Sequence, residues 1–401
     1  MPHILVLNGG SSSLKFAVFS ESLARTLTGK IERITLPGTK FSFKDSTTNE
    51  QDTRDLPISN FAAAGQFLLD WLDQRVKLDS IEAIGHRVVH GGPKYSEPQR
   101  VSDELLAELR RIAPFDPEHM PAEIALIELT RKRFPNVPQI TCFDTAFHAT
   151  LPRVARILPI PRKYEALGVQ RYGFHGISYQ YLMQELLRLD KRAMSQWNDK
   201  LGFRTDGKVI LCHFGNGASL AAVRDGKCID TSMAFTPAAG ILMGTRTGNL
   251  DPGLVKFLFE TEHLSADQFH SMVNHESGLR GVSETSSDMR DLLAKESSDV
   301  RAAEAVALFC YEAKKWIGAF AAALGGLDIL VFSGGIGEHA PVIRERICSG
   351  MEFLGIWGLD DELNATNAPV ISIERASVRL RVIPTDEELM IAQSVAQFSK
   401  P

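Results

Sequence analysis

Residues 209–225 of the chain read VILCHFGNGASLAAVRD, and this stretch carries the strongest signal for the fold. The apolar run at its start is typical of a strand buried on both faces. Gly215 and Gly217 flank Asn216, which predicts a tight turn with outward-pointing backbone N–H groups, and a strand-like pattern resumes at Ser219. Such a strand–turn–strand can hold a phosphate group, although an ordinary hairpin also contains turns of this kind.

The same form occurs a second time, at residues 4–18, which read ILVLNGGSSSLKFAV. A shift of 206 residues places Gly9 on Gly215 and Ser13 on Ser219. This weak internal similarity predicts two related halves of the chain rather than a short-period repeat. Two turns of this kind could hold one polyphosphate from both sides.

Composition narrows the class of protein. The 401 residues suit two domains better than one hydrophobic core. The chain has 44% hydrophobic and 23% charged residues, as globular proteins do, and its net charge of −5 argues against a general nucleic-acid or anionic-membrane binder. The five cysteines are scattered without a C-x-x-C pair, which predicts reduced core residues. With no charged leader and no apolar run of membrane length, we expect a cytoplasmic protein without nucleic-acid or membrane partners.

Apolar periodicity and turn residues predict the remaining elements. Short apolar runs predict buried strands over residues 81–84, 140–143 and 329–332. Helical spacing predicts helices over residues 61–76, 103–112, 122–134, 179–189, 300–324 and 385–398. Thr385 and Glu388 have the spacing of a capping box, which gives Glu388 a structural role and leaves Glu387 available to a functional site.

Four polar residues stand at the ends of predicted strands or in irregular segments. Burying an unpaired arginine is costly, so Arg87 is expected at the end of its strand or at a polar cleft. Asp144 follows the next strand, a position that fits catalytic or metal chemistry and fits a helix cap equally well. Arg246 lies among Gly and Thr residues, which suits anion binding as well as a solvated loop charge. His175 fits either a site histidine or a packed core histidine.

Nine ordered segments together resemble the acetate kinase family, or acetokinases, across nearly the whole chain. They are residues 8–15 (NGGSSSLK), 85–92 (GHRVVHGG), 143–148 (FDTAFH), 172–176 (YGFHG), 213–219 (HFGNGAS), 243–246 (MGTR), 286–290 (SSDMR), 334–338 (GGIGE) and 384–388 (PTDEE). The resemblance implies an α/β fold of two duplicated RNase-H-like domains, as in the actin-like ATPases, with a nucleotide cleft between them. It further implies a homodimer, a first domain of residues 1–146 plus 386–401, and a second domain of residues 147–385 that carries the nucleotide site.

The resemblance also implies catalytic and metal-binding roles. Arg87 and Arg246 would bracket the transferring phosphoryl group and the carboxylate, and His175 would donate a hydrogen bond to phosphoryl oxygens. Asp144 would act beside the metal ion as a further catalytic residue. Two more residues, Asn8 and Glu387, would organise Mg²⁺, with Mn²⁺ as an alternative, and its waters.

Two larger groups of residues are implied to contact the substrates. The acyl group would be bound by Arg87 together with Val89, Phe115, Phe174 and Pro237. ATP or ADP would be contacted by Ser13, Lys15, His213, Phe214, Gly215, Asn216, Gly217, Asp288, Met289, Arg290, Gly335, Ile336, Gly337 and His339.

The chain departs from the family motifs around the acyl substrate. The family's Leu-His pair is replaced by Phe115 and Asp116, so the histidine is either lost to Asp116 or displaced to His119. A second carboxylate near the phosphoryl acceptor would repel it, so Asp116 is expected to turn away or pair with a cation, and His119 to face the substrate. Ala238 and Ala239 stand where the family has Leu-Glu.

The expected activity is that of an acetate kinase, which transfers a phosphoryl group directly and reversibly from ATP to acetate and gives acetyl phosphate and ADP. The altered acyl segment leaves a kinase of propionate or another short-chain acid as the alternative. An ATP-binding switch of the actin or chaperone type is a more remote alternative from another class.

Overall fold

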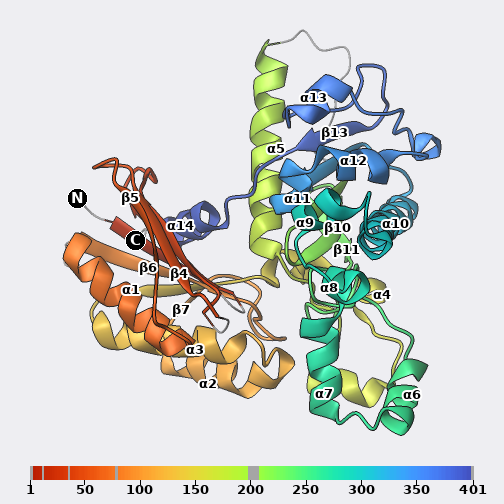
Figure 1. The fold of residues 1–401 in the computed structure, drawn as a ribbon. Coiled ribbons are helices and arrows are strands. Elements are labelled where there is room, and N and C mark those ends of the chain that lie inside the picture. The colour runs from red at the N-terminus through yellow and green to blue at the C-terminus, as the bar shows by residue number, and fades with distance from the viewer. Residues whose placement is uncertain (1–2, 11–12, 35–36, 77–79, 197–206, 399–401) are drawn as a thin grey trace. The chain divides into compact units, whose positions relative to one another are not determined.

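A computed structural model describes residues 3–10, 13–34, 37–76, 80–196 and 207–398 (Figure 1). Ser11 and Ser12 of the first glycine turn fall outside these ranges. The chain forms two compact units, which we call unit 1 (Met1–Phe147 with Asp386–Pro401) and unit 2 (His148–Thr385).

Unit 1 is built on an eight-stranded sheet with the order β5-β4-β3-β2-β1-β6-β8-β7. Strands β1, β2 and β3 are antiparallel neighbours. On its other side β1 pairs with β6 in parallel, and β6 pairs with β8 in parallel. The strands are β1 (His3–Gly9), β2 (Ser13–Ser20), β3 (Arg25–Glu32), β4 (Lys40–Asp45), β5 (Gln51–Asp55), β6 (Ile81–Val88), β7 (Gln99–Arg100) and β8 (Gln139–Phe143).

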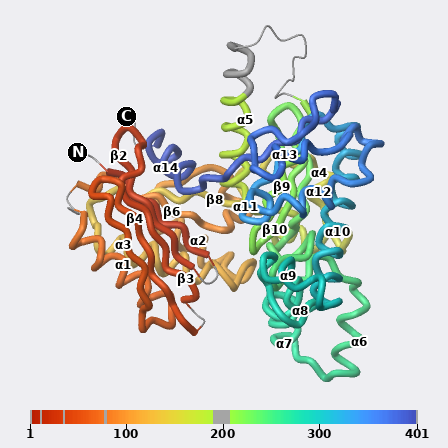
Figure 2. The backbone as a smooth tube through the Cα atoms, turned by 45° about the horizontal axis from the view of Figure 1, so that its top comes forward, coloured from red at the N-terminus to blue at the C-terminus, as the bar shows by residue number. Residues whose placement is uncertain are grey.

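Helices cover both faces of this sheet (Figure 2). Helix α1 (Phe61–Arg75) packs on one face together with α3 (Met120–Arg133), and α2 (Asp103–Ile112) continues this layer. The core there is aromatic, with Phe16 edge-on to Trp71 at a ring distance of 5.6 Å. Helix α14 (Glu387–Phe398) packs on β1 and β6, where Gly85 leaves room for it. A Cβ at Gly85 would lie 2.5 Å from a methyl group of Ile391.

Unit 2 contains a five-stranded sheet with the order β11-β10-β9-β12-β13. Its strands are β9 (Lys208–Phe214), β10 (Ala218–Arg224), β11 (Lys227–Thr231), β12 (Ile329–Ser333) and β13 (Arg379–Val382). Strands β9, β10 and β11 are antiparallel neighbours, and β9, β12 and β13 are parallel. This order and these directions repeat those of β3-β2-β1-β6-β8 in unit 1, so the predicted duplicated RNase-H-like fold is confirmed.

Two long helices lie on opposite sides of the unit 2 sheet (Figure 1). Successive residues of a strand face opposite sides, and on β9 the imidazole of His213 contacts Ser178 of α5 (Gly176–Gln196). The ring of Phe214 instead packs edge-on against Phe309 of α10 (Val300–Leu324) at 5.4 Å. The turn between β9 and β10 therefore lies at the end of a strand that is covered on both faces.

The rest of unit 2 consists of short elements. They are α4 (Arg153–Arg156), η4 (Arg162–Leu167), α6 (Gly253–Thr261), α7 (Ala266–Ser271), η5 (Met272–Glu276), α8 (Gly278–Ser283), α9 (Met289–Lys295), α11 (Gly334–His339), α12 (Pro341–Cys348), η6 (Glu352–Leu354) and α13 (Asp361–Ala365). Two further 3₁₀ turns are η2 (Ala113–Phe115) and η3 (Ala146–Thr150). Across the described ranges, no helix is long and apolar enough to cross a bilayer. All five cysteines are buried and free, as predicted.

Two predicted helix starts are wrong. Helix α5 begins at Gly176 rather than Tyr179, because the Tyr179 N–H already donates to the His175 carbonyl at 3.0 Å. The capping box at the C-terminal helix is also absent. Asp386 caps α14 by accepting the Leu389 N–H at 3.0 Å, and aspartate is at least as good an N-cap as threonine. Thr385 instead contacts another hydroxyl, as described below.

Three buried histidines should make the fold sensitive to acid. Burial lowers the pKa of His86, His90 and His148 to about 4 in each case. The unfolded chain has histidine pKa values near 6.5, so it binds protons first as the pH falls. The stability contribution of each histidine is therefore complete above pH 6.5 and lost as the pH falls through 4, by roughly 3 kcal/mol per histidine.

Urea unfolding at pH 7, 5.5 and 4.5 measures this loss. The variant His86→Gln removes one of the three groups, so its unfolding free energy should depend less steeply on pH than that of the wild type over this interval. Equal pH dependence in the two proteins would contradict a depressed pKa at His86.

Candidate active site

Arg87, at the end of β6, is held by three acceptors of unit 1. Its Nη1 donates to the Gly9 carbonyl at 2.6 Å and to Glu123 Oε1 at 3.2 Å, and its Nη2 donates to Asp144 Oδ2 at 2.7 Å. Only 11% of the side chain is exposed. Burial opposes the positive charge, but the carboxylates of Asp144 and Glu123 outweigh burial and raise the pKa of Arg87 above its usual value. The result is a permanently charged guanidinium in a fixed orientation.

Asp144 follows β8 directly and is fully buried. Its backbone N–H donates to the Val88 carbonyl at 2.9 Å, which joins the carboxyl ends of β6 and β8. Carboxyl ends of parallel strands are where ligands bind in open α/β sheets. Through its ion pair with Arg87, Asp144 belongs to the polar cluster of Arg87, Glu123 and the Gly9 carbonyl.

Asn8, at the end of β1, connects the same region to α14. Its amide nitrogen donates to Glu387 Oε2 and to Glu388 Oε1, both at 2.9 Å. Both carboxylates are therefore tied to Asn8, and the separation of roles predicted for Glu387 and Glu388 is wrong, because Asp386 takes over the helix cap.

The oxygen atoms of this region suit a hard divalent cation. With both amide hydrogens of Asn8 donated, its carbonyl oxygen and the Glu387 carboxylate offer the ligands that Mg²⁺ prefers. Within the described part of the chain, no three His, Cys, Asp or Glu residues form a metal cage. Mg²⁺ is typically held by one or two carboxylates with waters and substrate phosphates, so the residues present fit this ion.

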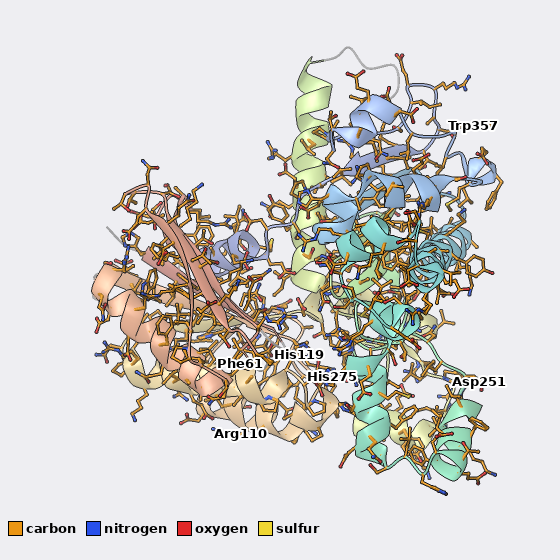
Figure 3. All side chains as sticks on the ribbon, viewed as in Figure 1. Phe61, Arg110, His119, Asp251, His275 and Trp357 are labelled. Carbon is orange, nitrogen blue, oxygen red and sulfur yellow. The ribbon has the colours of Figure 1, made fainter. Side chains whose placement is uncertain are left out.

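Asp116 and His119 form a buried pair near the N-terminus of α3, where Figure 3 labels His119. Asp116 accepts from His119 Nδ1 at 2.9 Å and from its backbone N–H at 3.2 Å, and both side chains are buried. The neighbouring Phe115 ring packs edge-on against His90 at 5.5 Å. The Asp116 carboxylate is thus engaged by the imidazole of His119.

In unit 2, two histidines are stacked beside the β9–β10 turn. The rings of His175 and His213 are 4.2 Å apart and inclined by 27°. His175 Nδ1 contacts the Ser219 hydroxyl at 2.8 Å, and His213 Nδ1 contacts the Ser178 hydroxyl at 2.9 Å. His175 Nε2 faces Gly217, where a Cβ would lie only 3.3 Å away. His175 is therefore oriented by its neighbours and is not simply a packed core residue.

Hydroxyl groups complete this cluster. The Tyr179 hydroxyl lies 2.5 Å from Ser219 Oγ, and the Thr385 hydroxyl lies 2.8 Å from Ser178 Oγ. Each stacked histidine thus contacts one hydroxyl group, which in turn contacts a second hydroxyl group. These contacts fix the orientation of each ring.

Arg246 joins the same cluster. A Cβ on Gly217 would lie 3.7 Å from Arg246 Nη1, so this arginine and His175 flank the same glycine. Arg246 Nη1 donates to the Pro237 carbonyl at 3.2 Å, which ties it to a residue predicted for the acyl pocket. The Met243 N–H donates to the Arg246 carbonyl at 3.0 Å and closes the loop.

Three glycine-containing segments of unit 2 meet at the β9–β10 turn. The Gly244 N–H donates to the Asn216 carbonyl at 3.0 Å. Gly334 has a φ of 75°, and a Cβ there would lie 2.7 Å from the Phe214 carbonyl. A Cβ on Gly215 would lie 3.9 Å from the Gly335 nitrogen. A side chain is excluded at Gly334, and a Cβ at Gly244 would lie 2.4 Å from Asn216 Oδ1, so backbone approaches closely there, as a polyphosphate site requires.

The other predicted nucleotide residues lie around these segments. Asp288 caps α9 and pairs with the exposed Arg290 at 2.6 Å, whereas Met289 is buried. Phe214 is fully buried, and its ring belongs to the core. The remaining residues Ile336, Gly337 and His339 belong to α11.

Four predicted residues remain, and one of them, Val89, joins the Arg87 cluster through its backbone N–H, which donates to Glu123 Oε2 at 2.9 Å. Ser13 begins β2 and accepts the Gly10 N–H on its carbonyl at 2.7 Å. Lys15 is exposed and lines a cavity of about 270 Å³ together with Glu388. Val89 and Phe174 are both buried, one in each unit.

The sequence did not reveal Glu123 or the hydroxyls of Ser178 and Tyr179 as site residues. Glu123 lies within α3 beside buried apolar residues such as Ile124 and Ile127. An acidic residue at a core position of a helix is the signal that could have identified it, because carboxylates are rarely buried without a partner.

Comparisons with known proteins identify the family of this chain. A model of the acetokinase family matches residues 3–393. An acetate kinase of Bacillus subtilis (strain 168) is 40% identical over 408 residues, which cover 100% of both chains. The crystal structure of Porphyromonas gingivalis acetate kinase has a TM-score of 0.87 at 36% identity and full coverage of both chains. That of a Francisella tularensis propionate kinase has a TM-score of 0.89 at 34% identity, covering 99% of this chain and 100% of the other. The chain belongs to the acetokinase family.

Proposed function

We propose that this protein is an acetate kinase, which transfers the γ-phosphoryl group of ATP to acetate reversibly and gives acetyl phosphate and ADP. The observation that carries the proposal is the fixed, buried Arg87, which lies between Asp144 and the end of β1. Phosphoryl transfer spreads negative charge over oxygen atoms, and enzymes accelerate it mainly by aligning the reactants and neutralising that charge.

Unit 1 supplies the acceptor side of the reaction. Arg87 binds the acetate carboxylate and the phosphoryl group through the donors that Gly9, Asp144 and Glu123 leave available. Val89 and Phe115, the residues of unit 1 assigned to the acyl group, contact its methyl group. A carboxylate is already a nucleophile at neutral pH, so an oxygen of acetate can attack the γ-phosphorus in line without a strong general base.

Unit 2 supplies the nucleotide side. The glycine-containing segments at Asn216 and Gly335 receive the phosphates, and the residues at the start of α9 line the adenosine pocket. His175 and Arg246 flank Gly217 and donate to the equatorial oxygens of the transferring group. The hydroxyl of Ser219 holds the His175 ring in this orientation.

Asn8 and Glu387 would hold Mg²⁺, with Asp144 ordering its waters. When bound, the ion supplies charge neutralisation at the phosphate oxygens. The sequence and the α14 contacts support this assignment, since Asn8 is already oriented by Glu387 and Glu388.

A hydroxamate assay tests the proposed function. Acetate, Mg-ATP and hydroxylamine are incubated with the protein, and only an acyl phosphate gives acetohydroxamate. We expect hydroxamate that depends on acetate. ATP hydrolysis without hydroxamate would instead support the actin-type or chaperone-type switch.

Propionate is the second candidate acceptor. One solved relative is titled a propionate kinase, and Ala238 and Ala239 next to Pro237 are small side chains. Phe115 packs against His90 and narrows the space on the unit 1 side. We therefore expect acetate to remain the better substrate and propionate to be accepted.

The variant Phe115→Leu tests the expected preference for acetate over propionate. Leucine is smaller than phenylalanine, so we expect kcat/KM for propionate to rise relative to acetate by about 10-fold, the lower end of what one methylene contributes in an apolar pocket. Initial rates with C1 to C4 acids measure the ratio. An unchanged ratio would place Phe115 outside the acyl pocket.

We further propose that the protein is a cytoplasmic homodimer. Free buried cysteines suit a reducing compartment. In unit 2, a cavity of about 770 Å³ is bordered by Leu250, Val282 and Leu308, which are 36–42% exposed. Exposed apolar patches of this kind mark protein interfaces, and a second copy of the chain is the partner we assign.

Light scattering should give twice the mass of one chain. Val282→Glu should shift the protein toward the monomer, whereas the exposed control Val154→Glu should not.

A further inference from the structure

Glu123 lies where three segments of unit 1 meet. It belongs to the first turn of α3, next to the end of β1 and the end of β6. A Cβ on Gly9 would lie 3.6 Å from the Glu123 side chain, and only 4% of Glu123 is exposed. No role in the reaction has been assigned to it so far.

Both oxygens of this carboxylate are engaged. Oε1 accepts from Arg87 Nη1 at 3.2 Å, and Oε2 accepts the backbone N–H of Val89 at 2.9 Å. One side chain therefore spans the phosphoryl-binding arginine and a residue of the acyl pocket. Among the described residues, no acceptor lies in hydrogen-bond range of Arg87 Nε, so this part of the guanidinium remains for substrate oxygens.

The environment of Glu123 opposes its charge. Burial raises the pKa of Glu123, whereas Arg87 and the Val89 N–H favour the ionised form, in which both oxygens accept hydrogen bonds. Asp116 and Asp144 are further carboxylates that disfavour that charge. The position near the N-terminus of α3 favours a carboxylate through the helix dipole. A buried carboxylate is costly, and a residue selected only for packing would be apolar at this position.

We infer that Glu123 is a positioning residue: it fixes Arg87 against the Val89 backbone so that the guanidinium meets the acceptor carboxylate in one orientation. This inference rests on the proposed kinase function. Gly9 and Asp144 hold Arg87 from two other directions, and Glu123 supplies the third. Removing the Glu123 charge releases Nη1 from one of its two acceptors and lets the guanidinium turn.

The variant Glu123→Gln tests the inference, because it keeps an oxygen for the Val89 N–H and loses the charge that holds Arg87. We expect kcat to fall by about 10- to 100-fold, the scale of a charge-assisted hydrogen bond, with the KM for ATP within about twofold of wild type. The matched control is Glu128→Gln, on the same helix, whose side chain pairs with Arg110 at the surface. Should Glu123→Gln not fold, Glu123→Asp is measured in its place: it keeps the charge but is one methylene shorter than the side chain that now spans Arg87 and the Val89 N–H, so kcat should again fall with the KM for ATP little changed.

A double-mutant cycle with Arg87→Ala separates positioning from general support of the fold. If Glu123 acts through Arg87, adding Glu123→Gln to Arg87→Ala should change kcat by less than about twofold. Full recurrence of the loss in that background, equal changes in all kinetic constants, or unchanged activity of the single variant would each overturn the inference. A wild-type protein that makes no acetohydroxamate would contradict the proposed function itself.

Discussion

Arg87→Ala is expected to lower kcat by about 10²- to 10³-fold, the scale of losing one preorganised charge contact in a transition state. The same change should destabilise unit 1, because Asp144 and Glu123 would remain buried without the cation that they now surround. Breaking a buried pair from one side costs about 3–5 kcal/mol. Steady-state kinetics with acetate and thermal melting measure the two effects.

A second variant separates the loss of charge from the loss of guanidinium geometry, and a third serves as a surface control. Arg87→Lys keeps the charge but loses the fork geometry, so it should recover most of the stability and little of kcat. The surface variant Arg110→Ala should change neither quantity by much. If Arg87→Ala had a near-normal kcat and a raised KM alone, Arg87 would bind the ground state and have no special role in the transition state.

Arg246→Ala should produce a loss of kcat of similar size, about 10²- to 10³-fold, with a smaller loss of stability. Arg246 donates to the Pro237 carbonyl and contacts the Met243 sulfur, whereas Arg87 is held by two buried carboxylates. Steady-state kinetics measure the loss of kcat, and thermal melting measures the loss of stability.

The control for this prediction is Arg153→Ala, an arginine of unit 2 that pairs with Glu165 at the surface. It should retain the wild-type kcat. An Arg246→Ala protein that melts as early as Arg87→Ala, or that keeps its kcat, would show that the loop of Arg246 serves the fold and not the transferring group.

The architecture could be predicted because local and global signals agree. The turns at Gly9 and Gly215 follow buried strands and recur at a fixed shift, and the structure gives both strands the same place in a five-strand order that the two sheets share. Helices such as α10, whose start at Val300 and stop at Gly325 the sequence marks clearly, were predicted at their observed bounds.

The site was only partly predictable, because its side chains depend on contacts distant in sequence. Asn8 meets Glu387 and Glu388 from the other end of the chain. The capping-box spacing at Thr385 was misleading, since Asp386 offered a competing cap one residue later.

Within the acyl segment, sequence showed the altered motif but could not show that Asp116 and His119 pair with each other. Glu123 was missed for a related reason. Its partners Arg87 and Val89 lie at the end of β6 and directly after it, and nothing in a helical pattern indicates which core position faces them.

The most direct test follows the acetate oxygens themselves. The protein is incubated with Mg-ATP and acetate labelled with ¹⁸O in its carboxylate, and the products are observed by ³¹P NMR. Attack of acetate on the γ-phosphorus predicts an acetyl phosphate resonance shifted by a bridging ¹⁸O. ADP and unlabelled inorganic phosphate without any acetyl phosphate would contradict phosphoryl transfer to the carboxylate.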